Sequence, residues 1–498
     1  MVAGFSVLTR FFGFLFRIYL SRELGAELLG VYQVAFSVFM VLIVLISSGI
    51  PLAISKLTAV YRVTNNHKAE NSVTTSALIV GLLISFVLCA VILIFQNHLG
   101  LLFADERCIY ILITLLPAVI ASAVYSAFRG SLWGTQNYFS VCWTEFAEQI
   151  LRIVAFVIMA NWLFTSLDGA EIAGWSMSIA CVLSATLVMI VYFKNGKRLA
   201  HPKGYFKPIL KSAIPVTGVR TASSLIQPVI AVLFPAMLVL AGYTSEQAME
   251  SYGMAMGMTF PLLFLPTTVV GALSFILIPE LSTAIAKNET ELISNRIKTS
   301  LIFALFISAM VVPFYMGIGE QIGVFLYDNI SSGVYLVRSA WVMLPLGLSN
   351  ITSSILNAYN LEVKSFINNI IGGVLLLGII AGCSGFMGVD ALVWGFGACM
   401  TTTTILNLVM LKKHTKLKLG LTKPSVLMLI FTIPCALLSH LSYPLLMVLF
   451  PKFVTISLCA IIGMGGFALL CYLFKLIDFT TVLVKIKPKA IKKLSKNV

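Results

Sequence analysis

The segment TSALIVGLLISFVLCAVILIF, residues 75–95, carries no charged residue along its whole length. The segment LIFALFISAMVVPFYMGI, residues 301–318, is equally apolar on every side. A membrane-spanning helix needs about 20 mainly apolar residues, whereas a strand of a membrane barrel alternates apolar and polar residues over about 10. Both segments therefore predict helices that cross a membrane.

The rest of the chain repeats this pattern. Of its 498 residues 59% are hydrophobic and only 11% are charged, and the mean hydropathy is +0.99. This composition is too apolar for a water-soluble globular protein. We predict an all-α membrane protein with about fourteen transmembrane helices. The predicted spans are 3–20, 31–58, 75–95, 109–133, 140–163, 172–193, 212–242, 252–278, 299–318, 337–358, 365–384, 389–411, 425–441 and 453–476.

Basic residues concentrate in three regions, at 194–211, at 412–423 and after 475. The positive-inside rule makes these regions cytoplasmic, and counting spans from them makes both termini cytoplasmic as well. We therefore predict a multi-pass protein of the cell membrane. Because the net charge of +15 is confined to such regions, we expect membrane lipids rather than nucleic acid as partners.

A weak internal repeat divides the chain. At an offset of 228 residues, Ile50-Pro51 matches Ile278-Pro279, and a second Leu-Pro pair matches in the same way at 116–117 and 344–345. Six helices per half is an even number, so the repeat is parallel, with a pseudo-two-fold axis along the membrane normal. We predict an N-terminal six-helix lobe at 1–200 and a C-terminal six-helix lobe at 201–411. Residues 412–498 add two transmembrane helices, which either pack against the second lobe or form a lipid-binding groove, and a basic cytoplasmic tail.

Charged residues inside the predicted spans are the candidates for function. Arg10, Gly13 and Arg17 are spaced i, i+3 and i+7, which places them on one face of the first span. An arginine at the centre of a spanning helix costs about 2.5 to 3.5 kcal/mol, so this face is expected to meet protein or water. We interpret it as a substrate-binding face for an anion. The alternative is that one arginine extends its charge to the membrane surface.

Further candidates lie in four other spans. Lys56, Arg129 and Arg220 are also assigned to substrate binding, although each stands near an inner end where basic residues are ordinary. Glu148 precedes Arg152 by four residues, the favourable order for an ion pair within a helix. Glu145 stands one turn earlier. These three residues form either a charge pair that holds the helix in place or a site for ion coupling.

The sequence contains no motif for catalysis. There is no GxxxxGK[ST] phosphate-binding loop, no HExxH and no GxSxG. The nine cysteines include no CxxC pair and no cluster with histidine, so neither a metal site nor another cofactor is expected. We predict a transporter rather than an enzyme. Residues 3–20 read as a retained first helix, not a cleaved signal, and Met1 as a late start.

Five stretches carry a family resemblance when taken together. They are LTRFFGFLFRIYLSRELGAELLGVYQ (8–33), SSGIPLAISKLTAVY (47–61), FRGSLWGTQNY (128–138), EQILR (148–152) and YGMAMGMTFPLLFLPTT (252–268). The chain resembles the multidrug/oligosaccharidyl-lipid/polysaccharide (MOP) exporter superfamily, specifically its polysaccharide-transporter branch, which includes sporulation proteins and lipid II flippases.

The resemblance implies a two-lobed helical bundle that alternates between inward and outward states. The implied cargo is an undecaprenyl-diphosphate-linked saccharide, either a peptidoglycan precursor or a polysaccharide repeat unit, for cell-wall or spore-cortex synthesis. Wall-synthesis enzymes are the implied protein partners. The resemblance assigns the diphosphate to Arg10 and Arg17. The family's FRG and EQxxR patterns are matched in this chain by Arg129 and Gly130 and by Glu148 and Arg152, so the resemblance marks these four residues as well.

Three other functions remain open from the sequence. A cation-coupled multidrug antiporter of the same fold would need unpaired acids in the first lobe, where the candidates are mainly arginines. A membrane-embedded transferase would need carboxylates or histidines in sizeable outer loops, and the predicted outer loops are short. A non-transporting scaffold of a wall-synthesis complex fits the sequence, and only a flipping assay separates it from a transporter.

Overall fold

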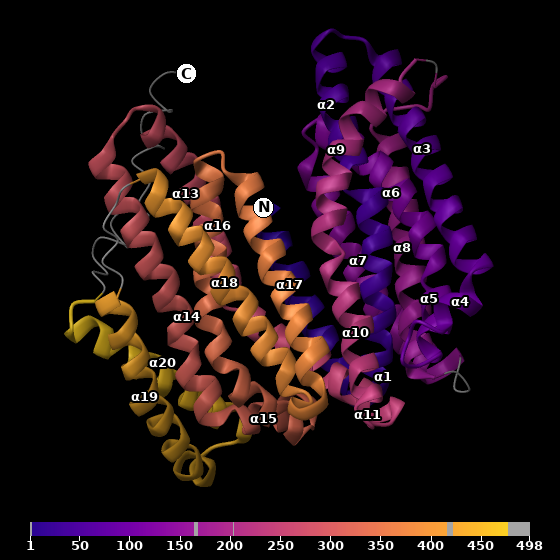
Figure 1. The fold of residues 1–498 in the computed structure, drawn as a ribbon. Coiled ribbons are helices and arrows are strands. Elements are labelled where there is room, and N and C mark those ends of the chain that lie inside the picture. The colour runs from indigo at the N-terminus through magenta and orange to yellow at the C-terminus, as the bar shows by residue number, and fades with distance from the viewer. Residues whose placement is uncertain (1, 164–167, 203, 416–421, 477–498) are drawn as a thin grey trace. The chain divides into compact units, whose positions relative to one another are not determined.

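The computed structural model describes residues 2–163, 168–202, 204–415 and 422–476 (Figure 1). Within these residues the chain forms helices joined by short connections, with no β-strand. This confirms the predicted all-α class.

Twelve helical stretches among the described residues are long and apolar enough to cross a membrane. The first, Val7–Val63, has 57 residues and covers both of the first two predicted spans. Its helices are α1 (Val2–Ser47) and α2 (Gly49–Val63), and α1 is interrupted only at Gly25, whose φ of 69° leaves the helical region. The predicted span 140–163 corresponds to α7 (Tyr138–Ile158), which is not among the twelve. The count of fourteen spans stays a prediction.

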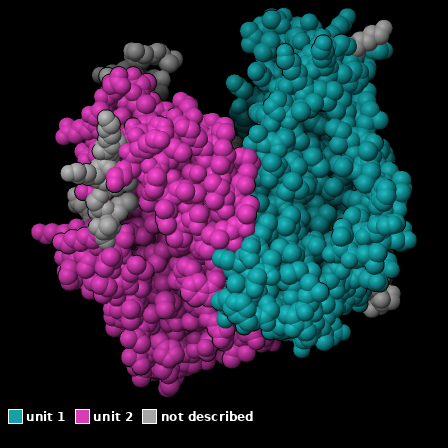
Figure 2. Space-filling model, viewed as in Figure 1, with its two compact units in different colours: residues 1–258, 377–391 teal, residues 259–376, 392–498 magenta. Residues whose placement is uncertain are grey.

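The chain divides into two compact units, coloured separately in Figure 2. Unit 1 comprises residues 1–258 and 377–391, and unit 2 comprises residues 259–376 and 392–498. The lobe boundary at residue 200, which rests on the sequence repeat, stays a prediction.

Unit 1 contains the first eleven helices. After α1 and α2 its helices are α3 (His67–Ile94), α4 (Gln96–Gly100), α5 (Arg107–Thr114), α6 (Leu116–Gly134), α7, α8 (Gly169–Lys194), α9 (Phe206–Ser224), α10 (Ile226–Leu240) and α11 (Ser245–Tyr252). Short π-helical segments follow α7 at Met159–Leu163 and α11 at Gly253–Thr259. One core cluster joins α2, α3 and α9 through side chains such as Ile54, Val73 and Ile209.

Close helix approaches in unit 1 depend on glycine. A Cβ atom at Gly30 of α1 would lie 2.0 Å from the backbone oxygen of Met249 in α11. A Cβ atom at Gly253 would lie 1.9 Å from the backbone oxygen of Ala26. Because helices in a membrane gain little from burying apolar surface against each other, small residues that permit backbone contact hold them together.

Unit 2 contains the remaining helices. They are α12 (Phe260–Phe264), α13 (Thr267–Ala286), α14 (Thr290–Tyr327), α15 (Ile330–Ser339), α16 (Met343–Ala358), α17 (Glu362–Met387), α18 (Asp390–Thr415), α19 (Thr422–Leu449) and α20 (Lys452–Leu473), with a 3₁₀ turn at Ala340–Val342. The end of α17 and the start of α18 cluster with unit 1. A second core cluster packs α19 and α20 against α14 through Phe306, Phe431 and Phe467.

Candidate functional site

The first helix places Arg10, Gly13 and Arg17 along its length, as the sequence spacing predicts. Arg10 is exposed and Arg17 is half-buried. Seven residues of helix separate the two Cα atoms by about 10 Å along the axis. The two guanidinium groups are therefore presented about two turns apart on one stripe of α1.

Helix α7 packs against α1 through aromatic side chains. The ring centroids of Phe12 and Phe146 lie 5.8 Å apart, and those of Phe16 and Phe156 lie 5.7 Å apart. At Gly13 the neighbour is Gln149, because a Cβ atom there would lie 3.7 Å from its amide oxygen. Gly13 therefore faces Gln149 of α7, and a methyl group at this position would meet that side chain at an ordinary van der Waals distance.

That polar face holds two ion pairs. Arg152 Nη2 lies 3.4 Å from Glu148 Oε1 within α7, and both side chains are less than a quarter exposed. Arg129 Nη1 reaches from α6 to lie 3.5 Å from Glu145 Oε1. The Arg129 guanidinium also lies 4.2 Å from the ring centroid of Trp133, a cation–π distance. Both acids of the site are therefore matched by an arginine.

Helix α6 can place Arg129 because two glycines bring it against α2. A Cβ atom at Gly130 would lie 2.8 Å from Pro51 Cα, and one at Gly134 would lie 2.6 Å from Thr58 Cβ. Any larger residue would separate the two helices. Arg129 is next to Gly130 in the chain, so this close approach fixes the start of its side chain.

Three nitrogen donors of the site are buried without a hydrogen-bond partner among the described residues: Arg129 Nε, Gln149 Nε2 and Arg152 Nε. A buried donor without an acceptor is costly and uncommon in folded proteins. Two of these donors belong to guanidinium groups and one to a side-chain amide, and all three can donate to an acceptor such as a phosphate oxygen. Among the described residues, no group of three or more His, Cys, Asp or Glu side chains could hold a metal ion.

The structure places two candidates elsewhere in unit 1. Lys56 is exposed on α2 and Arg220 is exposed on α9. Among the described residues, no hydrogen bond or ion pair joins either to the α1–α7 site, by which we mean Arg10, Gly13, Arg17, Arg129, Glu145, Glu148, Gln149 and Arg152. Their role in substrate binding stays a prediction.

Sequence reasoning missed two features of this site. Gln149 is 8% exposed and faces Gly13, yet neither charge nor spacing singles it out within the EQILR stretch. The Arg129–Glu145 pair crosses from α6 to α7 and has no helical spacing to reveal it.

Half-buried arginine and glutamate side chains on apolar helices mark a candidate functional site in a membrane protein. Comparison with known proteins shows what the chain is similar to. A family model described as "Polysaccharide biosynthesis protein" matches residues 2–245. The chain is 24% identical over 387 residues to stage V sporulation protein B of Bacillus subtilis (strain 168), covering 75% of this chain and 74% of that protein. It is 20% identical over 467 residues to lipid II flippase MurJ of the same organism, covering 85% and 84%.

Solved structures share the fold. The inward-facing conformation of a multidrug resistance MATE family transporter of the MOP superfamily superposes with a TM-score of 0.69, at 16% identity, covering 83% of this chain and 96% of that one. The inward closed conformation of lipid II flippase MurJ gives a TM-score of 0.67, at 14% identity, covering 95% and 98%. The sequence relatives confirm the predicted resemblance to sporulation proteins and lipid II flippases, and the solved structures show the shared fold. The chain is a multi-pass membrane protein, and its similarity to a lipid II flippase supports a flippase or exporter.

Proposed function

We propose that this protein moves an undecaprenyl-diphosphate-linked saccharide across the cytoplasmic membrane by alternating access, with Arg10 and Arg17 as the ligands of the diphosphate. The observation that carries the proposal is the charge balance of the α1–α7 site. Counted by residue, the α1–α7 site holds four arginines, Arg10, Arg17, Arg129 and Arg152, and two glutamates, which pair with Arg129 and Arg152. The site therefore holds more arginines than acids, which favours an anionic cargo.

The same balance argues against a cation-coupled multidrug antiporter. Such a transporter needs an acid that is available to a cation, and both acids of the site face an arginine at 3.4 to 3.5 Å. Likeness of fold does not separate the two functions, because MATE transporters and a lipid II flippase both share this fold. The charge balance of this chain's own residues favours an anionic cargo over a cation-coupled drug.

An apolar groove in unit 2 supports a cargo with a lipid tail. Its volume is about 310 Å³, and its lining comes from α14, the 3₁₀ turn, α16 and α19, including Met316, Trp341, Leu344 and Leu429. Among the two uses predicted for the last pair of helices, this groove favours lipid binding.

The membrane potential is the proposed driving force. A charge that crosses a potential of 100 mV gains about 2.3 kcal/mol, so exporting two net negative charges from a negative interior gains about 4.6 kcal/mol. No ATP-binding motif is then required.

A reconstituted flipping assay tests the proposal. The full chain is placed in liposomes that contain an undecaprenyl-diphosphate saccharide, and the fraction of label exposed to a membrane-impermeant enzyme is followed with and without a potassium-diffusion potential. We expect the flipping rate to exceed that of protein-free liposomes. We also expect it to rise when the compartment from which the lipid headgroup leaves is electrically negative. A protein that never flips the lipid would instead be a scaffold, and indifference to a collapsed potential would remove the proposed driving force.

A further inference from the structure

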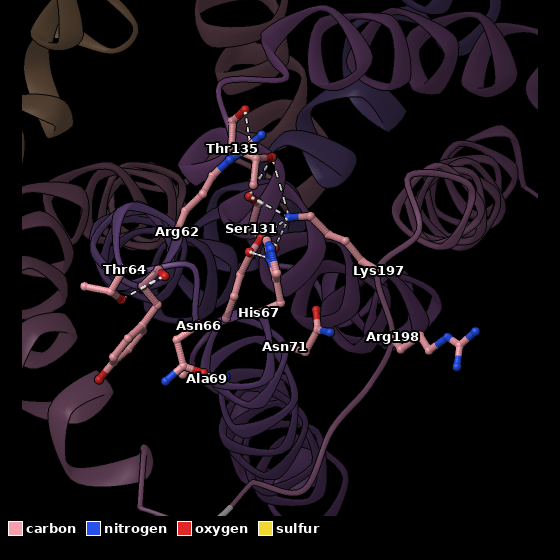
Figure 3. A network of polar contacts seen from close by, with 12 residues as sticks. Arg62, Thr64, Asn66, His67, Ala69, Asn71, Ser131, Thr135, Lys197 and Arg198 are labelled. Atoms are coloured by element: carbon pink, nitrogen blue, oxygen red, sulfur yellow. Dashed lines mark hydrogen bonds and ion pairs between the residues drawn. The ribbon is translucent and has the colours of Figure 1, made fainter.

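A second polar site lies in unit 1, away from the α1–α7 site. A pocket of about 430 Å³ opens where the end of α2, the start of α3, the α6–α7 connection and the residues after α8 come together. Figure 3 shows the network around it, in which Arg62 and Lys197 approach Ser131 and Thr135 from opposite sides. No residue of the pocket belongs to the site described above.

Lys197 is held firmly at this pocket. Its Nζ lies 2.9 Å from Glu70 Oε1 and donates a hydrogen bond to Ser131 Oγ at 2.8 Å. The side chains of Lys197 and Glu70 are only 11% and 6% exposed. Burial lowers the pKa of Lys197, the hydrogen bond and charge of Glu70 oppose that shift, and the charge of Arg62 adds to it. Arg62 and Lys197 both reach Thr135, through its backbone oxygen at 3.1 Å and its hydroxyl at 3.5 Å, so the two cations lie near each other.

Glu70, the acidic residue that lines the pocket, already interacts with two other side chains. One oxygen of Glu70 faces Lys197, and the other lies 3.5 Å from His67 Nδ1. Arg62 is fixed by a hydrogen bond from Nη1 to the backbone oxygen of Thr135 at 3.1 Å. No carboxylate lies within ion-pair distance of Arg62 among the residues that the structure describes. Its remaining N–H groups are donors without an acid.

The backbone adds positive potential. Helix α3, with 28 residues, begins at His67, and α7, with 21 residues, begins at Tyr138 beside the pocket residue Asn137. The N-terminal end of a helix carries about half a positive charge. Asn71 accepts a hydrogen bond from the Tyr192 hydroxyl through Oδ1, so its amide nitrogen is the group left to donate. The pocket thus offers the Arg62 guanidinium and the Asn71 amide as donors, while Lys197, whose N–H groups are taken by Glu70, Ser131 and Thr135, contributes its positive charge.

We propose that this pocket binds a phosphate-bearing anion, at a site separate from the one assigned to the transported diphosphate. A guanidinium fork recognises phosphate oxygens with two parallel hydrogen bonds. The volume is in the range of small-molecule sites, so the phosphate can belong to a soluble ester or to a lipid headgroup. The bound anion relieves the repulsion between Arg62 and Lys197 and links α2 to the segment that follows α8.

Equilibrium dialysis with radiolabelled pyrophosphate tests the site. The full chain in a neutral detergent is compared with Arg62→Gln and with a matched control, Arg198→Gln. Arg198 stands next to Lys197 in the chain, is exposed and points away from the network (Figure 3). We expect the control to bind as the unchanged protein does and Arg62→Gln to bind at least tenfold more weakly. Equal affinity of all three proteins would overturn the proposal.

The α1–α7 site is tested separately in an Arg10→Ala, Arg17→Ala variant. Pyrophosphate binding that persists there and is lost when Arg62→Gln is added supports the pocket, whether or not the protein proves to transport a lipid. Binding that vanishes with the α1 arginines alone overturns it. If Arg62→Gln unfolds at a lower temperature than the unchanged protein without ligand, Arg62→Lys is measured in its place. Its affinity for pyrophosphate should lie between those of the unchanged protein and Arg62→Gln.

The source of the phosphate is resolved in nanodiscs. Phosphatidylglycerol that weakens pyrophosphate binding, relative to phosphatidylcholine, identifies a lipid headgroup as the occupant. Unchanged binding identifies a soluble phosphate compound. If a lipid headgroup is the occupant, phosphatidylglycerol must no longer change pyrophosphate binding in the Arg62→Gln variant.

Discussion

The membrane-spanning helices of the two units satisfy their polar groups in different ways. Unit 1 uses charged pairs at Arg129–Glu145 and Glu148–Arg152, and in the described part of the chain Arg129 Nε, Gln149 Nε2 and Arg152 Nε have no hydrogen-bond partner. Unit 2 also holds an ion pair, between Glu280 near the end of α13 and Arg296 near the start of α14, and Arg296 Nε has no hydrogen-bond partner among the described residues. It uses in addition a neutral network in which Asn368 donates to Asn407 at 2.9 Å and Asn407 donates to Ser353 at 3.0 Å. Residues 299–319, 341–361 and 392–411 of unit 2 contain no charged side chain.

The difference indicates a division of roles. Neutral hydrogen bonds between membrane helices contribute about 0.6 to 2 kcal/mol each and need no ligand to complete them. A charge in the hydrocarbon is costly and usually marks a pathway or a binding site. We infer that the polar core of unit 2 stabilises the bundle, whereas the α1–α7 site of unit 1 recognises the cargo.

The largest effect is expected from removing the α1 arginines. The Arg10→Ala, Arg17→Ala variant should lose export of the lipid-linked saccharide by more than about 100-fold, because each lost hydrogen bond to a charged group costs about 1.5 to 3 kcal/mol. The flipping assay measures the rate, and membrane insertion should be normal. Lysine at both positions should restore only part of the rate, because a point charge lacks the bidentate fork. Undiminished flipping in the double alanine variant would remove these arginines from the cargo site.

The next effect concerns the pair within α7. Removing one charge, in Glu148→Gln or Arg152→Gln, leaves the other half-buried and uncompensated, at a cost of about 1 to 3 kcal/mol after allowing for their partial exposure. The exchanged variant Glu148→Arg, Arg152→Glu should recover most of the expression and thermal stability. An exchange as inactive as the worse single variant, in a protein that unfolds at the normal temperature, would assign the pair a direct role in transport.

Much of the fold could be predicted because hydropathy is local. The apolar runs indicate where helices form, and the i, i+4 spacing by itself places Glu148 within reach of Arg152. The first two predicted spans lie on either side of a kink at Gly25, and the sharpness of that break was not predicted. The residues around Gly25 are polar enough to suggest a loop, yet they are good helix formers, and only that glycine leaves the helix.

Contacts between distant segments could not be predicted from spacing. Lys197 meets Glu70 across 127 positions of sequence, and Gly253 meets Gly30 across 223. Such contacts depend on how helices pack, and a single sequence carries no periodic signal for them. The same limit hid the Arg129–Glu145 pair, although each residue is a candidate by itself.

A smaller effect is expected in unit 2, and it should fall on stability alone. Asn407 is fully buried, so Asn407→Ala leaves Asn368 without its acceptor and should cost about 1 to 3 kcal/mol. Thermal unfolding in detergent measures this loss. The matched control Asn350→Ala alters an exposed side chain on α16 and should change stability by less than about 0.5 kcal/mol. If Asn407→Ala lowered the flipping rate per folded molecule, the inference that the polar core of unit 2 only stabilises the bundle would be wrong.

The smallest effect separates charges that hold unit 1 together from charges that bind cargo. Asp105 lies outside the membrane-spanning segments and joins α5 to α11, accepting hydrogen bonds from Arg107 at 2.7 Å and from Ser245 at 3.4 Å. Burial alone would raise the pKa of Asp105, but the hydrogen bonds and charge of Arg107 outweigh it and hold the pKa below the ordinary value of 3.8.

The direction of the pH dependence follows from that lowered pKa. Asp105 binds its proton less readily in the folded protein than in the unfolded one, so its contribution to stability is fully present above pH 3.8 and is lost as the pH falls through the lower folded value. We expect Asp105→Asn to unfold at a lower temperature than the unchanged protein at pH 7, and the two unfolding temperatures to converge as the pH falls below about 4. Other carboxylates titrate in both proteins, so the difference between the two curves isolates Asp105. Flipping at pH 7 should be unchanged, because this cluster is separate from the α1–α7 site. Parallel curves with a constant offset would mean that the aspartate contributes through packing rather than through its charge, and a loss of flipping would extend the cargo site beyond α1 and α7.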